Sequence, residues 1–181
     1  MLIDKYLPQY QFSERHSIRI NASADKVLQN AICYDLQNDF FCKTALILRE
    51  LPNKILYKKN NHTIEHFSMK QFTCLETYKN TEVVFGLIGR FWQLNYRLNP
   101  CNNADDFLLF NQPNSAKLVF NFHTTALEQN KTMLSTETRI LCTDKIAQRN
   151  FLYYWYLIRP ISGMIRQRML KTISKESSIK N

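Results

Sequence analysis

Hydrophobic and polar side chains alternate cleanly between Phe12 and Ile20. The even positions place Glu14, His16 and Ile18 on the same face as these two end residues, while the odd positions carry only serine and arginine. A two-residue period of this kind predicts a β-strand with one buried face. That face is mostly apolar, but its middle holds a carboxylate and an imidazole.

A second alternating run begins at Lys117 and ends at Leu127, and a third begins at Lys131 after a short polar connection. Together they predict a β-hairpin in which Leu127 pairs with Lys131. Phe120 then faces Thr138, and both strands send the same face inward, which supports this register. We expect further strands at residues 67–75 and 81–89, and a short strand at residues 107–110.

Helical spacing of apolar residues predicts three helices. The first covers residues 24–33, the second covers about residues 39–51, and the third begins after a Thr143-Asp144 cap and reaches about Ser174. Pro160 and Gly163 should kink this long helix in its middle. Its predicted core stripe comprises Ala147, Phe151, Tyr154, Trp155, Ile158, Ile161, Ile165, Met169 and Ile173.

These elements predict an α+β fold. An antiparallel sheet commonly hides one face and wets the other, and the long amphipathic helix is the expected cover for the hidden face. A curved sheet around one helix leaves a pocket lined by aromatic and aliphatic side chains, which is a common form of ligand site. The 181 residues contain no repeat or linker, so we expect a single domain with its core at about residues 12–175.

Charge and composition narrow the classes of function. The formal charge is +9, and the segment from Asp144 onward holds eight basic residues against two acidic ones. A basic helix can meet an anionic membrane or nucleic acid, although a solvated helix face explains the same pattern. Only three glycines are present, which argues against a glycine-rich phosphate loop, and no apolar run is long enough to span a bilayer.

Cysteine usage bears on the compartment. Five cysteines, an odd number with no C-x-x-C spacing, predict free thiols in a reducing environment. The N-terminal segment lacks the apolar core of a secretory signal, so we expect a cytoplasmic protein. An H-x-x-E-H pattern at residues 62–66 matches a zinc motif, but short patterns often arise by coincidence, and we expect no metal and no cofactor.

Four short stretches carry a resemblance to a known family. They are ERH at residues 14–16, GLIGRFW at 86–92, LSTETR at 134–139 and YWYLIRP at 154–160. With the order of elements over about residues 12–175, the chain resembles the START-type superfamily, also called SRPBCC, polyketide-cyclase-like or birch-pollen-allergen-like. Within it, the chain is similar to a bacterial subgroup of unknown function. The resemblance implies a helix-grip fold, with a curved antiparallel sheet wrapped around a long C-terminal helix and two short helices after the first strand. The superfamily includes lipid carriers, cyclases, hydroxylase ligand domains and chaperone regulators, so the fold does not fix the function.

Glu14 and His16 are the first candidates for chemistry. Both point inward on the first strand, and a buried carboxylate and imidazole need partners, which each other or a ligand could provide. Such a pair can also orient a proton transfer. The alternative is a structural hydrogen-bonded pair near the end of the strand.

Arg90 and Trp92 follow the glycines at positions 86 and 89. A bulge at Gly89 would aim Arg90 at the mouth of the pocket, where it could bind an acidic head group. Without a bulge, the strand pattern places Arg90 with Glu82 on the outer face. We expect Glu137 and Arg139 on that face as well, in a cross-strand polar ladder.

The aromatic stretch of the long helix has two sides. Tyr154 and Trp155 belong to the core stripe, which in this architecture also lines the pocket. The opposite side carries Leu152, Tyr153 and Tyr156, mixed with basic residues. That side is expected to contact an anionic membrane transiently or to form a homodimer, whereas nucleic acid is not an expected partner.

Taken together, these patterns favour a carrier or sensor of a small hydrophobic ligand or lipid, with or without an acidic group, and no catalysis is required. One alternative is a cyclase-like or hydratase-like enzyme that uses Glu14 and His16. Another is a membrane-surface or partner-binding module that acts through the basic helix. Predicted ligand contacts come from His16, Phe85, Arg90, Trp92, Phe120, Phe122, Tyr154 and Trp155.

Overall fold

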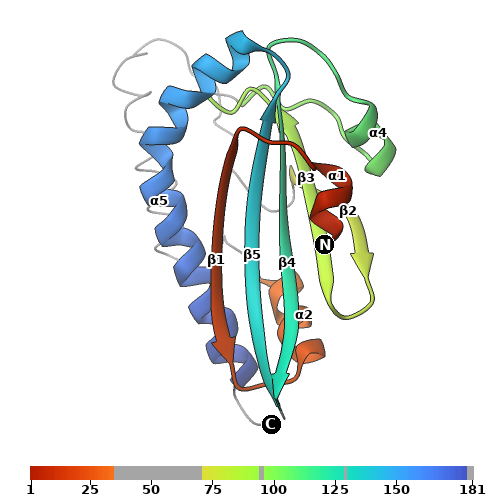
Figure 1. Cartoon of the computed structure of the whole chain (residues 1–181), viewed down its shortest axis with the longest axis vertical. Coiled ribbons are helices and arrows are strands. Elements are labelled where there is room, and N and C mark those ends of the chain that lie inside the picture. Colours follow the sequence, from red (N-terminus) through yellow and green to blue (C-terminus); the bar gives the residue numbers. More distant parts are fainter. Residues whose placement is uncertain (35–70, 94–95, 129, 179–181) are drawn as a thin grey trace.

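The computed structural model describes residues 1–34, 71–93, 96–128 and 130–178. In chain order the elements are α1 (Leu2–Tyr6), β1 (Phe12–Ile20), α2 (Ala24–Cys33), β2 (Thr73–Tyr78), β3 (Glu82–Gly89), α4 (Ala104–Leu109), β4 (Ala116–Glu128), β5 (Lys131–Cys142) and α5 (Lys145–Ser178) (Figure 1). The helix predicted at residues 39–51 and the H-x-x-E-H pattern lie outside the described residues, as do the first four residues of the strand predicted at 67–75. The chain is therefore α+β, with a long C-terminal helix.

The five strands form one antiparallel sheet in the order β1-β5-β4-β3-β2. The predicted hairpin register is confirmed along most of its length, since Phe120 pairs with Thr138. It is wrong at the turn, where Glu128 and not Leu127 pairs with Lys131. The register shifts by one residue there, and Asn130 takes a positive φ of 56°, the backbone conformation that asparagine tolerates in tight turns.

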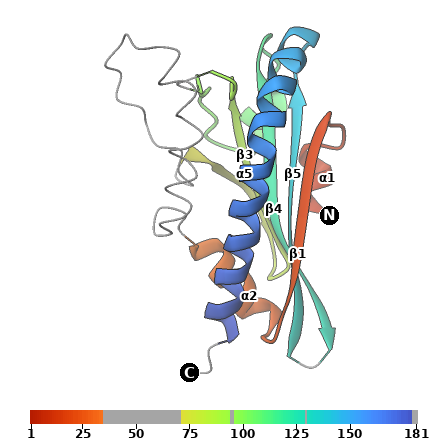
Figure 2. The ribbon, with the colours of Figure 1, turned by 90° about the vertical axis from the view of Figure 1, so that its left-hand side faces the viewer.

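One face of the sheet, here called the helix face, packs against α2 and α5 (Figure 2). The alternation predicted for β1 is confirmed, because Phe12 and Ile20 are buried and every odd position between them is exposed. α5 packs mainly along β1 and, to a lesser extent, β5. Of its predicted core stripe, the fully buried members are Ala147, Phe151, Trp155, Met169 and Ile173, and the other four are half-buried.

The opposite face, here called the outer face, is covered by α1 and α4 and was wrongly expected to be wet. Val84, Ile88 and Val119 point to this side and form a third core cluster with residues of the two short helices. The run from Val83 to Ile88 is apolar throughout, as suits a strand buried on both faces. The outer face is therefore a second, smaller layer of core.

The strand expected at residues 107–110 is also wrong, because this segment belongs to α4. The side chain of Asn103 accepts a hydrogen bond from the Asp106 backbone N–H at 2.8 Å and so caps the helix. Asp105 and Asp106 in the first turn are favourable at a helix N-terminus. Phe107, which was expected in a short strand, is instead fully buried beneath the sheet.

Gly86 and Gly89, the two glycines of β3, allow neighbouring residues to pack closely against the strand, and neither marks a bulge. A Cβ on Gly86 would lie 2.8 Å from side-chain atoms of Leu75 and Phe107, and one on Gly89 would lie 2.8 Å from the Tyr96 carbonyl oxygen. The β3–β4 register runs through both positions without a shift. The bulge that would have aimed Arg90 at the pocket is therefore not present.

α5 begins where predicted. The Asp144 carboxylate accepts hydrogen bonds from the backbone N–H groups of Ala147 at 2.7 Å and Asn114 at 2.5 Å. The helix continues as one element through Pro160 and Gly163 to Ser178, four residues beyond the predicted end. Among the described helices, none combines the length and hydrophobicity needed to cross a membrane. The four described cysteines are free thiols, as predicted.

Candidate functional site

A polar cluster lies on the helix face between its two apolar clusters. It consists of Glu14 and His16 from β1, Thr136 and Thr138 from β5, and Arg166 from α5, and is called here the central polar cluster. Strand register places the four sheet residues together, because Glu14 pairs with Thr138 and His16 pairs with Thr136. The same two rows continue across the sheet into phenylalanines, since Phe120 pairs with Thr138 and Phe122 with Thr136.

Glu14 and His16 contact each other directly. Their alternation on β1 turns both side chains toward α5, and Glu14 Oε1 lies 2.8 Å from His16 Nε2. The side chains retain only 10% and 19% of their accessible surface, respectively. Each of the two side chains therefore supplies part of the hydrogen bonding that the other requires when it is buried.

Arg166 reaches into this cluster from the helix. Its guanidinium donates to Thr136 Oγ1 at 3.0 Å and lies 5.6 Å from the centre of the Phe120 ring. Burial lowers the pKa of Arg166 to about 10, and the Glu14 carboxylate acts in the opposite direction. The side chain therefore keeps its positive charge at neutral pH.

Sequence reasoning grouped Arg166 with the basic helix surface and missed it as a site residue. A signal was available, because Arg166 follows Trp155 by eleven residues. Eleven residues make about three helical turns, which returns the chain to the same face. Arginine on the same face as a buried tryptophan indicates a side chain that faces the sheet.

Gly163 brings α5 close to the Glu14–His16 pair. A Cβ at this position would lie 2.8 Å from Glu14 Oε1 and 3.8 Å from the His16 ring. Glycine is an unfavourable residue in a helix interior, by about 1 kcal/mol relative to alanine. Here the absence of a side chain at Gly163 leaves the space that the Glu14 carboxylate occupies.

Three buried polar atoms of the central polar cluster have no hydrogen-bond partner within the described part of the chain. They are Glu14 Oε2, Thr138 Oγ1 and Arg166 Nε. An unsatisfied buried donor or acceptor costs about 1–3 kcal/mol, and more when the group is charged. Such atoms call for a specific partner, and here three of them, from three adjacent elements, converge on one region.

Among the residues that the structure describes, the apolar side of this region is not fully covered. Phe120 stacks on Phe85 with ring centres 5.0 Å apart and meets Phe122 edge-on at 5.7 Å. Phe85 and Leu118 lie on β3 and β4, two of the three inner strands, yet both are only half-buried. In a filled core, residues at the middle of the sheet would be fully covered, so the helix face retains accessible apolar surface beside the polar atoms.

The remaining predicted contacts gather elsewhere on the helix face, around Phe151. Trp155 stacks on its ring at 5.9 Å, Tyr154 lies at 5.6 Å, and Trp92 meets it edge-on at 6.4 Å. Arg90 follows β3 and is half-buried, with its backbone N–H bonded to the Tyr96 carbonyl at 2.7 Å. Of the predicted contacts, His16, Phe85, Phe120 and Phe122 therefore lie with the central polar cluster, and the aromatic residues around Phe151 form a separate group.

Glu82, Glu137 and Arg139 lie on the outer face as expected, but they are buried there and do not form a solvated ladder. Arg139 donates to Glu137 Oε1 and to Asp4 Oδ1, both at 2.7 Å. Asn121 then connects Glu137 with Glu82, donating to the Glu82 carboxylate at 2.6 Å and accepting from the Glu137 backbone N–H at 2.9 Å. These five side chains, called the outer-face network, fix α1 on the sheet.

Glu82 also caps α1. Its carboxylate accepts hydrogen bonds from the backbone N–H groups of Leu2 at 2.8 Å and Ile3 at 3.3 Å, two of the groups that a helix N-terminus leaves unpaired. No buried side-chain atom of the outer-face network lacks a partner in the part of the chain that the structure describes.

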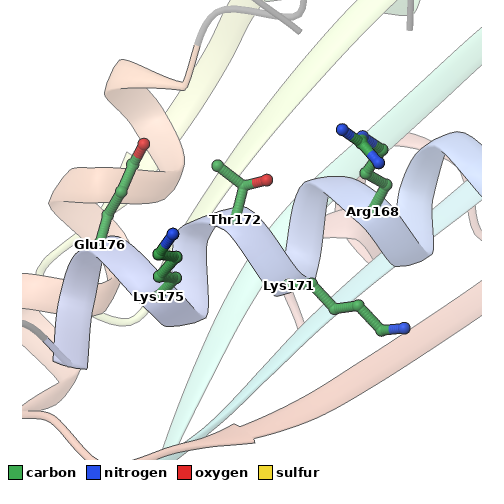
Figure 3. A pocket seen from close by; sticks show the side chains of 5 residues that line it. All are labelled: Arg168, Lys171, Thr172, Lys175 and Glu176. Carbon is green, nitrogen blue, oxygen red and sulfur yellow. The ribbon is translucent and has the colours of Figure 1, made fainter. Parts of the chain in front are cut away.

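A separate groove of about 460 Å³ lies at the surface near the C-terminal end of α5. Figure 3 shows its side chains projecting from consecutive turns of this helix; they are Arg168, Lys171, Thr172, Lys175 and Glu176. Three cations and one carboxylate give it a net positive charge. The described residues form no cluster of three or more histidine, cysteine or acidic side chains that could hold a metal ion.

Comparisons with known proteins add little to this geometry. No family model and no curated protein matches the chain. Among solved structures, a hypothetical protein from Helicobacter pylori is similar at 12% sequence identity and a TM-score of 0.42, covering 96% of this chain and 93% of that one. Likeness at this level carries no inference about function, and the START-type resemblance stays a prediction.

Proposed function

We propose that this protein binds a small hydrophobic molecule with an acidic head group between the helix face of the sheet and α5. The observation that carries the proposal is the set of three unpartnered buried atoms beside accessible apolar surface. A helix-grip arrangement of the START type belongs to the same proposal. The packing of α5 along β1 and β5 supports it.

The head group would meet Arg166. Its Nε is a charged donor without a partner, and a carboxylate or similar anion is the acceptor that best matches an arginine. Thr138 Oγ1 offers a further donor on the adjacent strand. The contact with His16 Nε2 keeps Glu14 Oε1 turned toward the imidazole ring.

The apolar body of the ligand would lie over Phe85 and Leu118, the half-buried side chains beside the buried Phe120 ring. Each Å² of apolar surface removed from water contributes about 25 cal/mol. Polar atoms at one end and accessible aromatic surface at the other fix a direction for the ligand, with its head group under α5 and its body across β4 and β3.

The experiment is a titration with 1-anilinonaphthalene-8-sulfonate, which combines an aromatic body with an anionic head. We expect Arg166→Met to weaken binding by about tenfold or more, since a hydrogen bond to a charged group contributes about 1.5–3 kcal/mol. Arg149→Met, which removes an exposed cation from the same helix, is the matched control and should leave binding unchanged. Equal affinity for the wild type and both variants would exclude this site.

A second candidate function is acid–base catalysis by the Glu14–His16 pair, which the 2.8 Å contact favours. Any small molecule extracted from the purified protein would be incubated with the wild type and with His16→Ala. A mass change that requires His16, with binding retained by the variant, would support an enzyme. An unchanged mass in both reactions would support binding without catalysis.

A further inference from the structure

The outward side of α5 carries an apolar stripe. Ile146, Tyr153, Leu157 and Met164 are spaced by seven, four and seven residues, which places them on one line along the helix. All four are exposed, Tyr153 by 73%. Leu152 and Tyr156 lie beside this line and are exposed as well.

The same line becomes basic toward the C-terminal end of the helix. Three basic residues follow Met164 at distances of four, seven and eleven residues along the helix, namely Arg168, Lys171 and Lys175. They line the groove of Figure 3. α5 as a whole carries seven basic residues against one acidic residue, Glu176. Between Lys145 and Met164 every charged residue is basic.

We infer that this outward side of α5 is a docking surface for an anionic membrane, with the helix lying flat in the plane of the lipid head groups. Tyrosines and aliphatic side chains on one stripe suit the boundary between head groups and acyl chains, and lysines beside them suit anionic head groups. The inference does not depend on the interior ligand site, because none of these side chains belongs to it.

Charge separates this partner from two others. A second copy of the chain would bring Lys145, Arg149 and Arg159 against the same three cations, with Glu176 as the single carboxylate on the helix, so the balance is repulsive. Nucleic acid would match the charge but not the exposed aliphatic side chains, which make no favourable contact with phosphates. An anionic bilayer matches both the charge and the apolar stripe.

The test is cosedimentation with vesicles of equal parts phosphatidylglycerol and phosphatidylcholine, compared with vesicles of phosphatidylcholine alone. We expect binding to the anionic vesicles that weakens with added salt. The triple variant Tyr153→Ser, Tyr156→Ser, Leu157→Ser should bind at least about tenfold more weakly. Lys171→Gln with Lys175→Gln should lower affinity by about fivefold per lysine.

Matched controls lie far from α5 in the fold. Tyr78 on β2 and Leu109 on α4 are also exposed hydrophobic side chains, and Tyr78→Ser with Leu109→Ser should leave vesicle binding unchanged. Circular dichroism would verify that all variants are folded. Failure of the wild type to sediment with anionic vesicles would overturn the inference, as would an equal loss in the control variant. A dimer that the triple variant disrupts, without vesicle binding, or binding to DNA alone would assign the surface to a different partner.

Discussion

The two faces of the sheet each bury a group of charged side chains, but the two groups differ in how well they are paired. In the outer-face network, Arg139 is bonded to Glu137 and Asp4, and Glu82 is bonded to Asn121 and the start of α1. In the central polar cluster, Arg166 has one hydrogen bond to Thr136, and its Nε finds no partner among the described residues.

Under the proposed function, this difference separates a structural role from a ligand-binding one. A fully bonded network stabilises the position of the element that it holds, here α1, and removing one member leaves the others buried and unpaired. A partly bonded cluster costs free energy in the unliganded protein. Violations of this kind are expected at functional sites, where a ligand supplies the missing partners.

The largest expected effect is on the outer face. Arg139→Met removes the cation between Glu137 and Asp4 and leaves a buried carboxylate without its partner. We expect the free energy of unfolding to fall by about 3–5 kcal/mol, measured by urea denaturation. Arg149→Met, at an exposed position, should change it by less than about 0.5 kcal/mol. A small loss for Arg139→Met would contradict the structural role of the network.

Two of the three buried glycines, Gly86 and Gly163, offer a matched pair of alanine substitutions. Gly86→Ala would press against Leu75 and the packed ring of Phe107, so we expect a loss of about 1–3 kcal/mol. Gly163→Ala would press only against the Glu14 carboxylate, the mobile end of a side chain, while improving helix propensity by about 1 kcal/mol.

For Gly163→Ala we therefore expect little change in unfolding free energy but displacement of Glu14 from His16. The readout is the NMR signal of the His16 ring, together with binding of the anionic probe. An unchanged His16 signal would show that the helix does not hold the pair in place.

A smaller effect is expected for Arg166→Met. The variant replaces a buried cation that has an unpaired Nε with an apolar side chain of similar length over Phe120. Among the described residues the variant loses one hydrogen bond, to Thr136, and no direct ion pair, so we expect the unfolding free energy to fall by no more than about 1 kcal/mol. A loss as large as that of Arg139→Met would assign the central polar cluster a structural role.

The smallest expected effect concerns pH. Hydrogen bonds from the N-terminal amine and from Arg139 lower the pKa of Asp4. A lowered folded-state pKa adds stability above the unfolded value of about 3.9, and that stability is lost as pH falls through the folded pKa. Because Asp4 is 52% exposed, we expect at most about 1 kcal/mol. The free energy of unfolding would be measured for the wild type and Asp4→Asn at neutral and at strongly acidic pH. We expect the two values to converge at low pH. An equal difference at both pH values would contradict this link between the pKa of Asp4 and stability.

Long periodic patterns allowed much of the fold to be predicted. β1, α2, β3 and α5 and most of the hairpin register follow from apolar spacing over eight or more residues, where local pattern and tertiary packing agree. α1 was missed because five residues carry no readable period, and its cap, Glu82, is distant in sequence. The unbroken apolar run in β3 was the available signal that the outer face is covered.

The site was predicted in part, for a physical reason. Alternation on β1 identified Glu14 and His16, since strand side chains reveal their face directly. Arg166 was missed because a basic residue on a basic helix is usually solvated, and only its spacing from Trp155 indicated otherwise. Unpaired hydrogen-bonding atoms depend on three-dimensional positions, so no sequence pattern could have revealed them.

The most direct test of the central claim is a high-resolution crystal structure of the protein as purified, with attention to electron density around Arg166 Nε, Thr138 Oγ1 and Glu14 Oε2. The account predicts density for a non-protein molecule whose polar end bonds Arg166 and whose apolar part covers Phe85 and Leu118. Ordered water molecules or the protein's own side chains completing all three hydrogen bonds, with no space left above the phenylalanines, would contradict it.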